Sequence, residues 1–129
     1  MENFLYETDD YRFKFEDGIF YMTYKTGPIT LSVAKEIVSK RRELMKGEDI
    51  WALIDDANLR SIDRDARDYL SSDEGIYGIR AGALLISSPF AKHLAKFFLM
   101  ITVNKPKIPT KVFSKRDEAL QWLKELKES

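Results

Sequence analysis

The chain has 129 residues, of which 44% are hydrophobic and 33% charged, as expected for one globular domain with a single core. Its 21 Lys and Arg residues balance 21 Asp and Glu residues, so the net charge of zero argues against nucleic-acid binding through an overall positive field. The sequence contains no cysteine, which excludes disulfides, thiolate catalysis and cysteine-based zinc sites.

The first ten residues, MENFLYETDD, have neither the basic start nor the apolar stretch of a signal peptide. The longest apolar stretches, AGALLI and FFLMITV, are too short to span a bilayer. We therefore expect a cytoplasmic protein without membrane insertion, folded as a single domain over residues 1–129.

Residues 4–26 are predicted to form two strands of a hairpin. The segment YRFKFEDGIFYMTYK alternates aromatic and polar residues on either side of Asp17-Gly18, which is a strong signal for a hairpin turn. Period-two alternation places five large apolar side chains on one face: Phe13, Phe15, Phe20, Met22 and Tyr24. We expect this face to pack into the core rather than to stack nucleic-acid bases.

A helix is predicted from Thr30, because the hydrophobic period changes there from two to that of a helix. Its apolar stripe contains Leu31, Ala34, Ile37, Val38, Leu44 and Met45. Arg41 lies near the same line, although the segment SKRREL (residues 39–44) is expected to be the solvated basic end of the helix, and Gly47 is suited to end it. The next apolar run, IWALID (residues 50–55), predicts a strand covered on both faces.

A second helix is predicted beyond this strand, because Ser61 or Asp63 can cap a segment of helical period that Gly75 and Gly78 end. The run AGALLIS (residues 81–87) then predicts a second buried strand.

A third helix is predicted from Ser88-Pro89, with the hydroxyl as its cap and the proline at its first position. Phe98, Leu99 and Met100 help to make this helix apolar on nearly all sides, so neighbouring elements or a second chain must cover it. We interpret these three residues as a candidate interface for a homodimer or another partner.

The last strand is predicted at TKVF (residues 110–113), followed by a capping box of Ser114 and Asp117. The final helix is expected to bury four side chains: Ala119, Leu120, Leu123 and Leu126. The element order predicts an α/β fold, with an N-terminal β-hairpin followed by alternating β-α units. We expect a mixed sheet of four to five strands packed by about four helices.

The sequence lacks the usual catalytic patterns, so we expect no enzyme, cofactor or metal site. Glycine-rich phosphate loops and GxSxG are absent, and the single histidine, His93, has no acid one helical turn away to orient it. Asp55 and Asp56 end a buried strand, where Mg²⁺ could bind. We favour the alternative that these neighbouring side chains point to opposite faces and cap the following turn.

The segment LIDDANLRSIDRDARDYL (residues 53–70) resembles the STAS domain, the SpoIIAA-like fold of bacterial anti-sigma factor antagonists. In that family an acidic strand end precedes an (Ile/Met)-Asp-Ser-Ser-Gly motif, whose serine opens a helix and is phosphorylated by a partner kinase. The overlay aligns Asp55 with the strand-end Asp, residues 62–63 with the Ile/Met-Asp pair and residues 64–66 with Ser-Ser-Gly. The segment IPTKVFSKRDEALQWL is similar to the last strand and helix of uncharacterised SpoIIAA-like proteins.

Asp65 stands where the family has its phosphoacceptor serine, so the resemblance does not extend to control by serine phosphorylation. The charge of Asp65 either mimics the phosphorylated state or only stabilises the helix start, by roughly 0.3–1 kcal/mol. Ser61 precedes the Ile-Asp pair and does not match the acceptor position.

The resemblance implies a non-enzymatic protein-interaction or signalling module. Its partner-binding residues would be Asp55, Asp56, Ser61, Asp63, Arg64 and Asp65. A small-molecule or lipid carrier, with a pocket between the third helix and the aromatic hairpin, is the alternative. An enzyme that uses Asp55, Asp56 or Asp63 with a metal is a third hypothesis.

Overall fold

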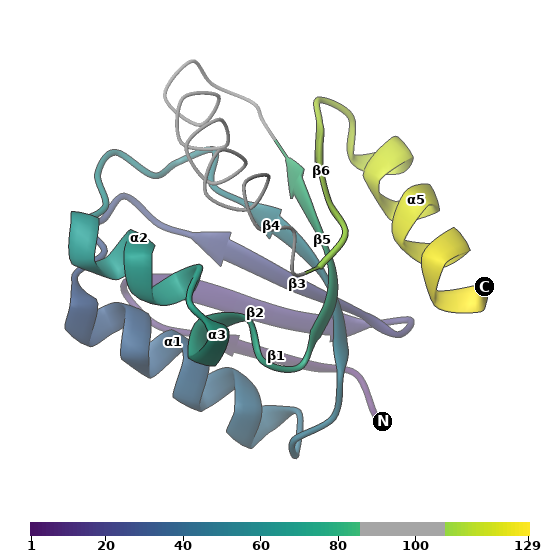
Figure 1. The fold of residues 1–129 in the computed structure, drawn as a ribbon, viewed down its shortest axis with the longest axis horizontal. Helices are drawn as coiled ribbons and strands as arrows, with labels where there is room; N and C mark the ends of the chain where they lie inside the picture. The colour runs from purple at the N-terminus through teal and green to yellow at the C-terminus, as the bar shows by residue number, and fades with distance from the viewer. Residues whose placement is uncertain (86–107) are drawn as a thin grey trace.

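Six strands form one mixed sheet in the computed structural model, which describes residues 1–85 and 108–129 (Figure 1). These strands are β1 (Phe4–Glu7), β2 (Tyr11–Glu16), β3 (Ile19–Tyr24), β4 (Ile50–Asp55), β5 (Ile79–Leu85) and β6 (Thr110–Phe113). They lie side by side in chain order; β1 to β3 are antiparallel, and β3 to β6 are parallel. The predicted α/β class is confirmed, with six described strands instead of four to five.

Helices cover both faces of this sheet. The described helices are α1 (Leu31–Leu44), α2 (Arg64–Leu70), α3 (Asp73–Ile76) and α5 (Arg116–Glu128). Figure 1 shows α1 and α2 on one side of the sheet and α5 on the other. Two core clusters result: a large aromatic one beneath α1 and α2, and a smaller one in which Leu53 and Phe113 pack against Leu123 of α5.

The aromatic hairpin packs as its alternation predicts. In the β2–β3 register Phe13 lies opposite Met22 and Phe15 opposite Phe20, and all four side chains are buried beneath α1 and α2. The rings of Phe13 and Phe20 have centroids 4.9 Å apart, within the range for a favourable aromatic pair.

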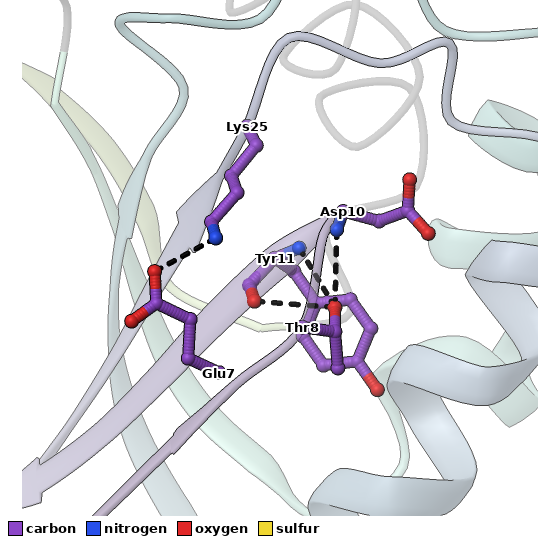
Figure 2. Close-up of polar contacts among 5 residues, drawn as sticks. All are labelled: Glu7, Thr8, Asp10, Tyr11 and Lys25. Carbon is purple, nitrogen blue, oxygen red and sulfur yellow. Dashed lines mark hydrogen bonds and ion pairs between the residues drawn. The ribbon is translucent and has the colours of Figure 1, made fainter.

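The prediction of two strands over residues 4–26 is wrong, because Thr8 divides the first of them into β1 and β2. The Thr8 hydroxyl accepts hydrogen bonds from the backbone N–H groups of Asp10 and Tyr11, both at 3.1 Å (Figure 2). An ion pair of 2.7 Å between Glu7 and Lys25 joins the end of β1 to the end of β3. A turn formed by one side chain does not change the alternation of apolar and polar residues, so that alternation cannot predict it.

The start of the first helix is confirmed, since the Thr30 hydroxyl accepts from the N–H of Val33 at 3.2 Å. Its end differs, because Lys46, with a positive φ of 54°, directly follows the C-cap Met45, and Gly47, with a φ of 74°, comes one residue later. The expectation of a solvated basic end is wrong for Arg41, which is only 4% exposed. Arg41 continues the stripe of Ile37 and Val38, so its side chain faces the sheet.

Two helix starts differ from expectation. The second predicted helix is divided into α2 and α3, because the Ser72 hydroxyl begins a new helix by accepting from the N–H of Gly75 at 3.1 Å. The predicted capping box of Ser114 and Asp117 is wrong, because β6 pairs through Phe113 and α5 begins only at Arg116. The third predicted helix, from Ser88, lies outside the described residues.

Candidate functional site

Asp55 and Asp56, at the end of β4, point to opposite faces of the sheet. Asp55 faces α5, where its Oδ2 lies 3.2 Å from the Arg116 guanidinium, and its Oδ1 accepts from the N–H of Ala57 at 3.0 Å. Asp56 faces the α1 side and is only 5% exposed. These positions agree with the interpretation that the two neighbouring side chains point to opposite faces, and the contact with Ala57 agrees with a turn-capping role for Asp55.

The loop that follows Asp56 is held by the connector between β3 and α1. The N–H of Arg60 donates to the Thr26 carbonyl at 2.9 Å, and the N–H of Asp63 donates to the Ile29 carbonyl at 2.9 Å. Ile29 and Ile62 form a parallel bridge, and the buried side chain of Leu59 anchors the middle of the loop. The loop conformation is therefore fixed by backbone contacts, although it contains no strand.

Four of the predicted site residues lie together on the surface where this loop enters α2. Ser61, Asp63, Arg64 and Asp65 are all exposed, and we call them the α2-start surface. Asp63 is the N-cap residue of α2 but its side chain makes no capping hydrogen bond, so its carboxylate faces solvent. Asp55 and Asp56 do not share this surface, because one is tied to Arg116 and the other is buried.

The interior contains a second candidate site, a cavity of about 90 Å³ between the sheet and the helices α1, α2 and α3. Its walls are mainly apolar and include Ile37, Ile54, Leu70 and Ile76. Asp56 lies at this cavity. A largely apolar cavity with a few polar groups is typical of small-molecule sites.

Asp56 is the most perturbed acid of the cavity. Burial raises its pKa from 3.8 to about 7, the Asp55 charge adds to the rise, and a hydrogen bond with its own backbone partly opposes it. No ion pair to Asp56 is found within residues 1–85 and 108–129. A carboxyl group in this setting exchanges its proton near neutral pH.

Tyr24 and Arg41 are two further polar residues that line the cavity, and the sequence alone did not assign them to a site. The guanidinium of Arg41 donates to the Tyr77 carbonyl at 2.8 Å. Burial lowers the pKa of Arg41 to about 10, and the neighbouring Arg42 charge acts in the same direction. Burial also raises the pKa of Tyr24, which the Asp56 charge raises further and the Arg41 charge lowers, so the phenol lies near both charges.

The sequence did indicate that Arg41 is buried, because it lies four residues after Ile37 and three after Val38 on an otherwise apolar stripe. Asp56 carried no such signal, because its burial depends on helices that are distant in sequence. The expected carrier pocket involves the third helix, which lies outside the described residues, so it stays a prediction. The described walls of the observed cavity come from β3–β6, α1, α2 and α3, together with Ile108.

Two further predictions concern an apolar interface and a metal. Phe98, Leu99 and Met100 lie outside the described residues, so the interface stays a prediction. The metal hypothesis required Asp55, Asp56 or Asp63, and the structure points these three carboxylates to different places. Within the described ranges, no three His, Cys, Asp or Glu side chains gather closely enough to hold a metal ion.

The comparison with protein families matches residues 13–127 to the model of a domain of unknown function, DUF7793. The chain belongs to the DUF7793 family. No curated protein matches this DUF7793 chain. Of its helices within the described ranges, none combines the length and the apolar character needed to cross a membrane.

A solved structure supports the fold of this DUF7793 domain. It is an uncharacterized protein of the DUF3478 family from Shewanella loihica PV-4, described as having a SpoIIAA-like fold. The two chains are 16% identical and superpose with a TM-score of 0.60, over 95% of this chain and 92% of the other. The predicted SpoIIAA-like fold is therefore confirmed, and at this identity the likeness extends to the fold alone.

Proposed function

We propose that this DUF7793 domain is a non-enzymatic, STAS-like interaction module that binds a protein partner through the α2-start surface. The observation that carries the proposal is that Ser61, Asp63, Arg64 and Asp65 are exposed on a loop whose backbone is already fixed. A surface that is ordered before binding loses little conformational entropy on binding, which favours affinity.

The fixed charge of Asp65 distinguishes this module from a switch controlled by serine phosphorylation. Asp65 lies in the first turn of α2, at the position that the resemblance gives to the phosphoacceptor serine. A permanent carboxylate there offers a partner the same negative charge at all times. We propose that binding is constitutive and depends on the Asp63 and Asp65 charges.

A charge-reversal experiment tests this proposal. The double variant Asp63→Lys/Asp65→Lys is compared with wild type and with Asp117→Lys/Glu118→Lys, which reverses two exposed acids in the first turn of α5. Each chain is first checked for unchanged thermal unfolding and is then used for affinity capture from lysate of the source organism. We expect a partner bound by wild type and the α5 variant but lost with the α2 variant; identical capture by all three contradicts the proposal.

A small-molecule carrier is the second candidate function, and the cavity that contains Asp56 is the observation that favours it. Its volume of about 90 Å³ is smaller than the 150 Å³ of a cavity that binds benzene, so it suits a small molecule better than a membrane lipid. The test is whether small apolar compounds raise the unfolding temperature of the full chain; no effect from any compound contradicts it.

A further inference from the structure

Gly82, in the middle of β5, lines the cavity between the sheet and α1. Residues 82 and 84 face the cavity side, while Ala81 and Ala83 belong to the core cluster beneath α5. A Cβ built on Gly82 would meet no described atom within 4 Å. Glycine weakens a strand interior and is typical of places where a ligand approaches the backbone closely.

Asp56 gives this cavity its chemical character. Only 5% of the residue is exposed, and it lines the cavity together with the apolar residues Ile54 and Leu84. A buried carboxylate is unfavourable unless a cation or several hydrogen-bond donors compensate it. The group is thus suited to accept a positively charged donor from a ligand.

Arg41 does not neutralise Asp56, although both residues line the cavity. Its guanidinium is directed to the Tyr77 carbonyl at 2.8 Å, and its charge is not among the causes that shift the Asp56 pKa. Asp55 instead adds negative potential near Asp56. The Asp56 end of the cavity therefore favours a cation over an anion.

We propose that this cavity binds a small apolar amine, whose ammonium group pairs with the Asp56 carboxylate and whose hydrocarbon part packs against Ile54 and Leu84, which are paired in the β4–β5 register next to Asp56. The inference rests on the carrier function, and it is independent of the α2-start surface. The cavity volume of about 90 Å³ accommodates a short alkyl chain rather than a large ring system.

Three probes of similar size and different charge test the inference: n-butylamine, n-butanol and sodium butyrate. Each is titrated into the full chain, and binding is followed by the backbone amide NMR signals of Gly82 and Ile76. We expect n-butylamine to bind about tenfold more tightly than n-butanol, because a charge-assisted hydrogen bond is added, and butyrate to bind most weakly.

Two variants locate the binding. Asp56→Asn is expected to reduce the affinity for n-butylamine about tenfold, to that for n-butanol, while Asp68→Asn, at an exposed acid of α2, leaves it unchanged. Leu84→Trp is expected to fill the space next to Asp56 and abolish binding of n-butylamine and n-butanol alike. Because Asp56→Asn keeps the side-chain shape, this variant decides even where Leu84→Trp does not fold.

The outcomes separate the inference from the carrier function. The amine preference is overturned if n-butanol or butyrate binds as tightly as n-butylamine or more tightly. It is also overturned if Asp56→Asn binds n-butylamine as tightly as wild type does. In both cases the carrier function remains. Absence of binding by all three probes, or n-butylamine binding that survives in folded Leu84→Trp, overturns the site itself.

Discussion

The backbone N–H of Ile29 donates a hydrogen bond to the carbonyl oxygen of Ser61 over 3.2 Å, joining the connector before α1 to the loop before α2. Gly27 lies against the same oxygen, since a Cβ at position 27 would be only 2.5 Å from it. The φ of Gly27 is also positive, at 87°. This close approach fixes the loop that presents the α2-start surface, and it requires glycine.

Gly27→Ala is expected to lower the free energy of unfolding by about 2 kcal/mol or more, because it combines a positive φ with a backbone clash. Gly47→Ala is the control: Gly47 also has a positive φ, of 74°, but no atom of the described residues lies within 4 Å of its Cβ position. The control is expected to cost about 1 kcal/mol. Urea unfolding measures both losses, and equal losses would contradict the proposed role of the close approach.

The ion pair between Asp55 and Arg116 is expected to contribute little to the free energy of unfolding. The Arg116 side chain is 48% exposed, so Arg116→Ala should lower the free energy of unfolding by less than about 1 kcal/mol, and added salt should reduce the loss. Asp55→Ala should cost about 1 kcal/mol more, because the N–H of Ala57 also loses its acceptor. Urea unfolding at low and high salt checks both values; a larger loss for Arg116→Ala is the contrary result.

Asp56 is expected to make the protein less stable as the pH rises from 3.8 to about 7. In this window the folded chain keeps a proton on Asp56 that the unfolded chain has lost, so raising the pH favours unfolding by at most about 1.4 kcal/mol per pH unit. Above the folded-state pKa this contribution no longer changes.

The measurement compares the free energy of unfolding of wild type and Asp56→Asn across this window, for example at about pH 5 and about pH 8. The variant lacks the titrating group, so its stability relative to wild type should increase with pH. A difference that is the same at both pH values would show that the buried carboxyl does not titrate as its surroundings imply.

Leu123 is expected to anchor α5 to the sheet. Its side chain is 0% exposed and packs in the cluster with Leu53 and Phe113, so Leu123→Ala should cost about 2–5 kcal/mol. Leu120, one turn earlier and only partly buried, is the matched position, and Leu120→Ala should cost less than about 2 kcal/mol. Thermal and urea unfolding compare the two; similar losses would mean that α5 packs through a different face.

Most of the fold follows from patterns within single segments. The runs IWALID and TKVF coincide with β4 and β6 residue by residue. IWALID is a short, mainly apolar run, and TKVF is rich in β-branched and aromatic residues, which favour strands. The turn at Thr8 could not be predicted from periodicity, since it depends on one hydroxyl that bonds to two backbone N–H groups. The division between α2 and α3 depends in the same way on the Ser72 hydroxyl.

The candidate sites were predictable only in part. Ser61, Asp63, Arg64 and Asp65 are neighbours in sequence, so a local motif sufficed to group them. The cavity was not predictable, because Tyr24, Arg41 and Asp56 come from three different elements and meet only when α1 packs on the sheet. The resemblance grouped Asp56 with the surface residues, whereas tertiary packing buries its side chain.

The spatial order of the described strands, β1 to β6, is the order in which a ribosome makes them. Each strand after β1 pairs with the strand that precedes it in the chain, so the edge that it needs has already been synthesised. We expect the three N-terminal strands to assemble first and to serve as a template during translation. Each later β-α unit can then add to a growing edge without displacing a strand that is already in place.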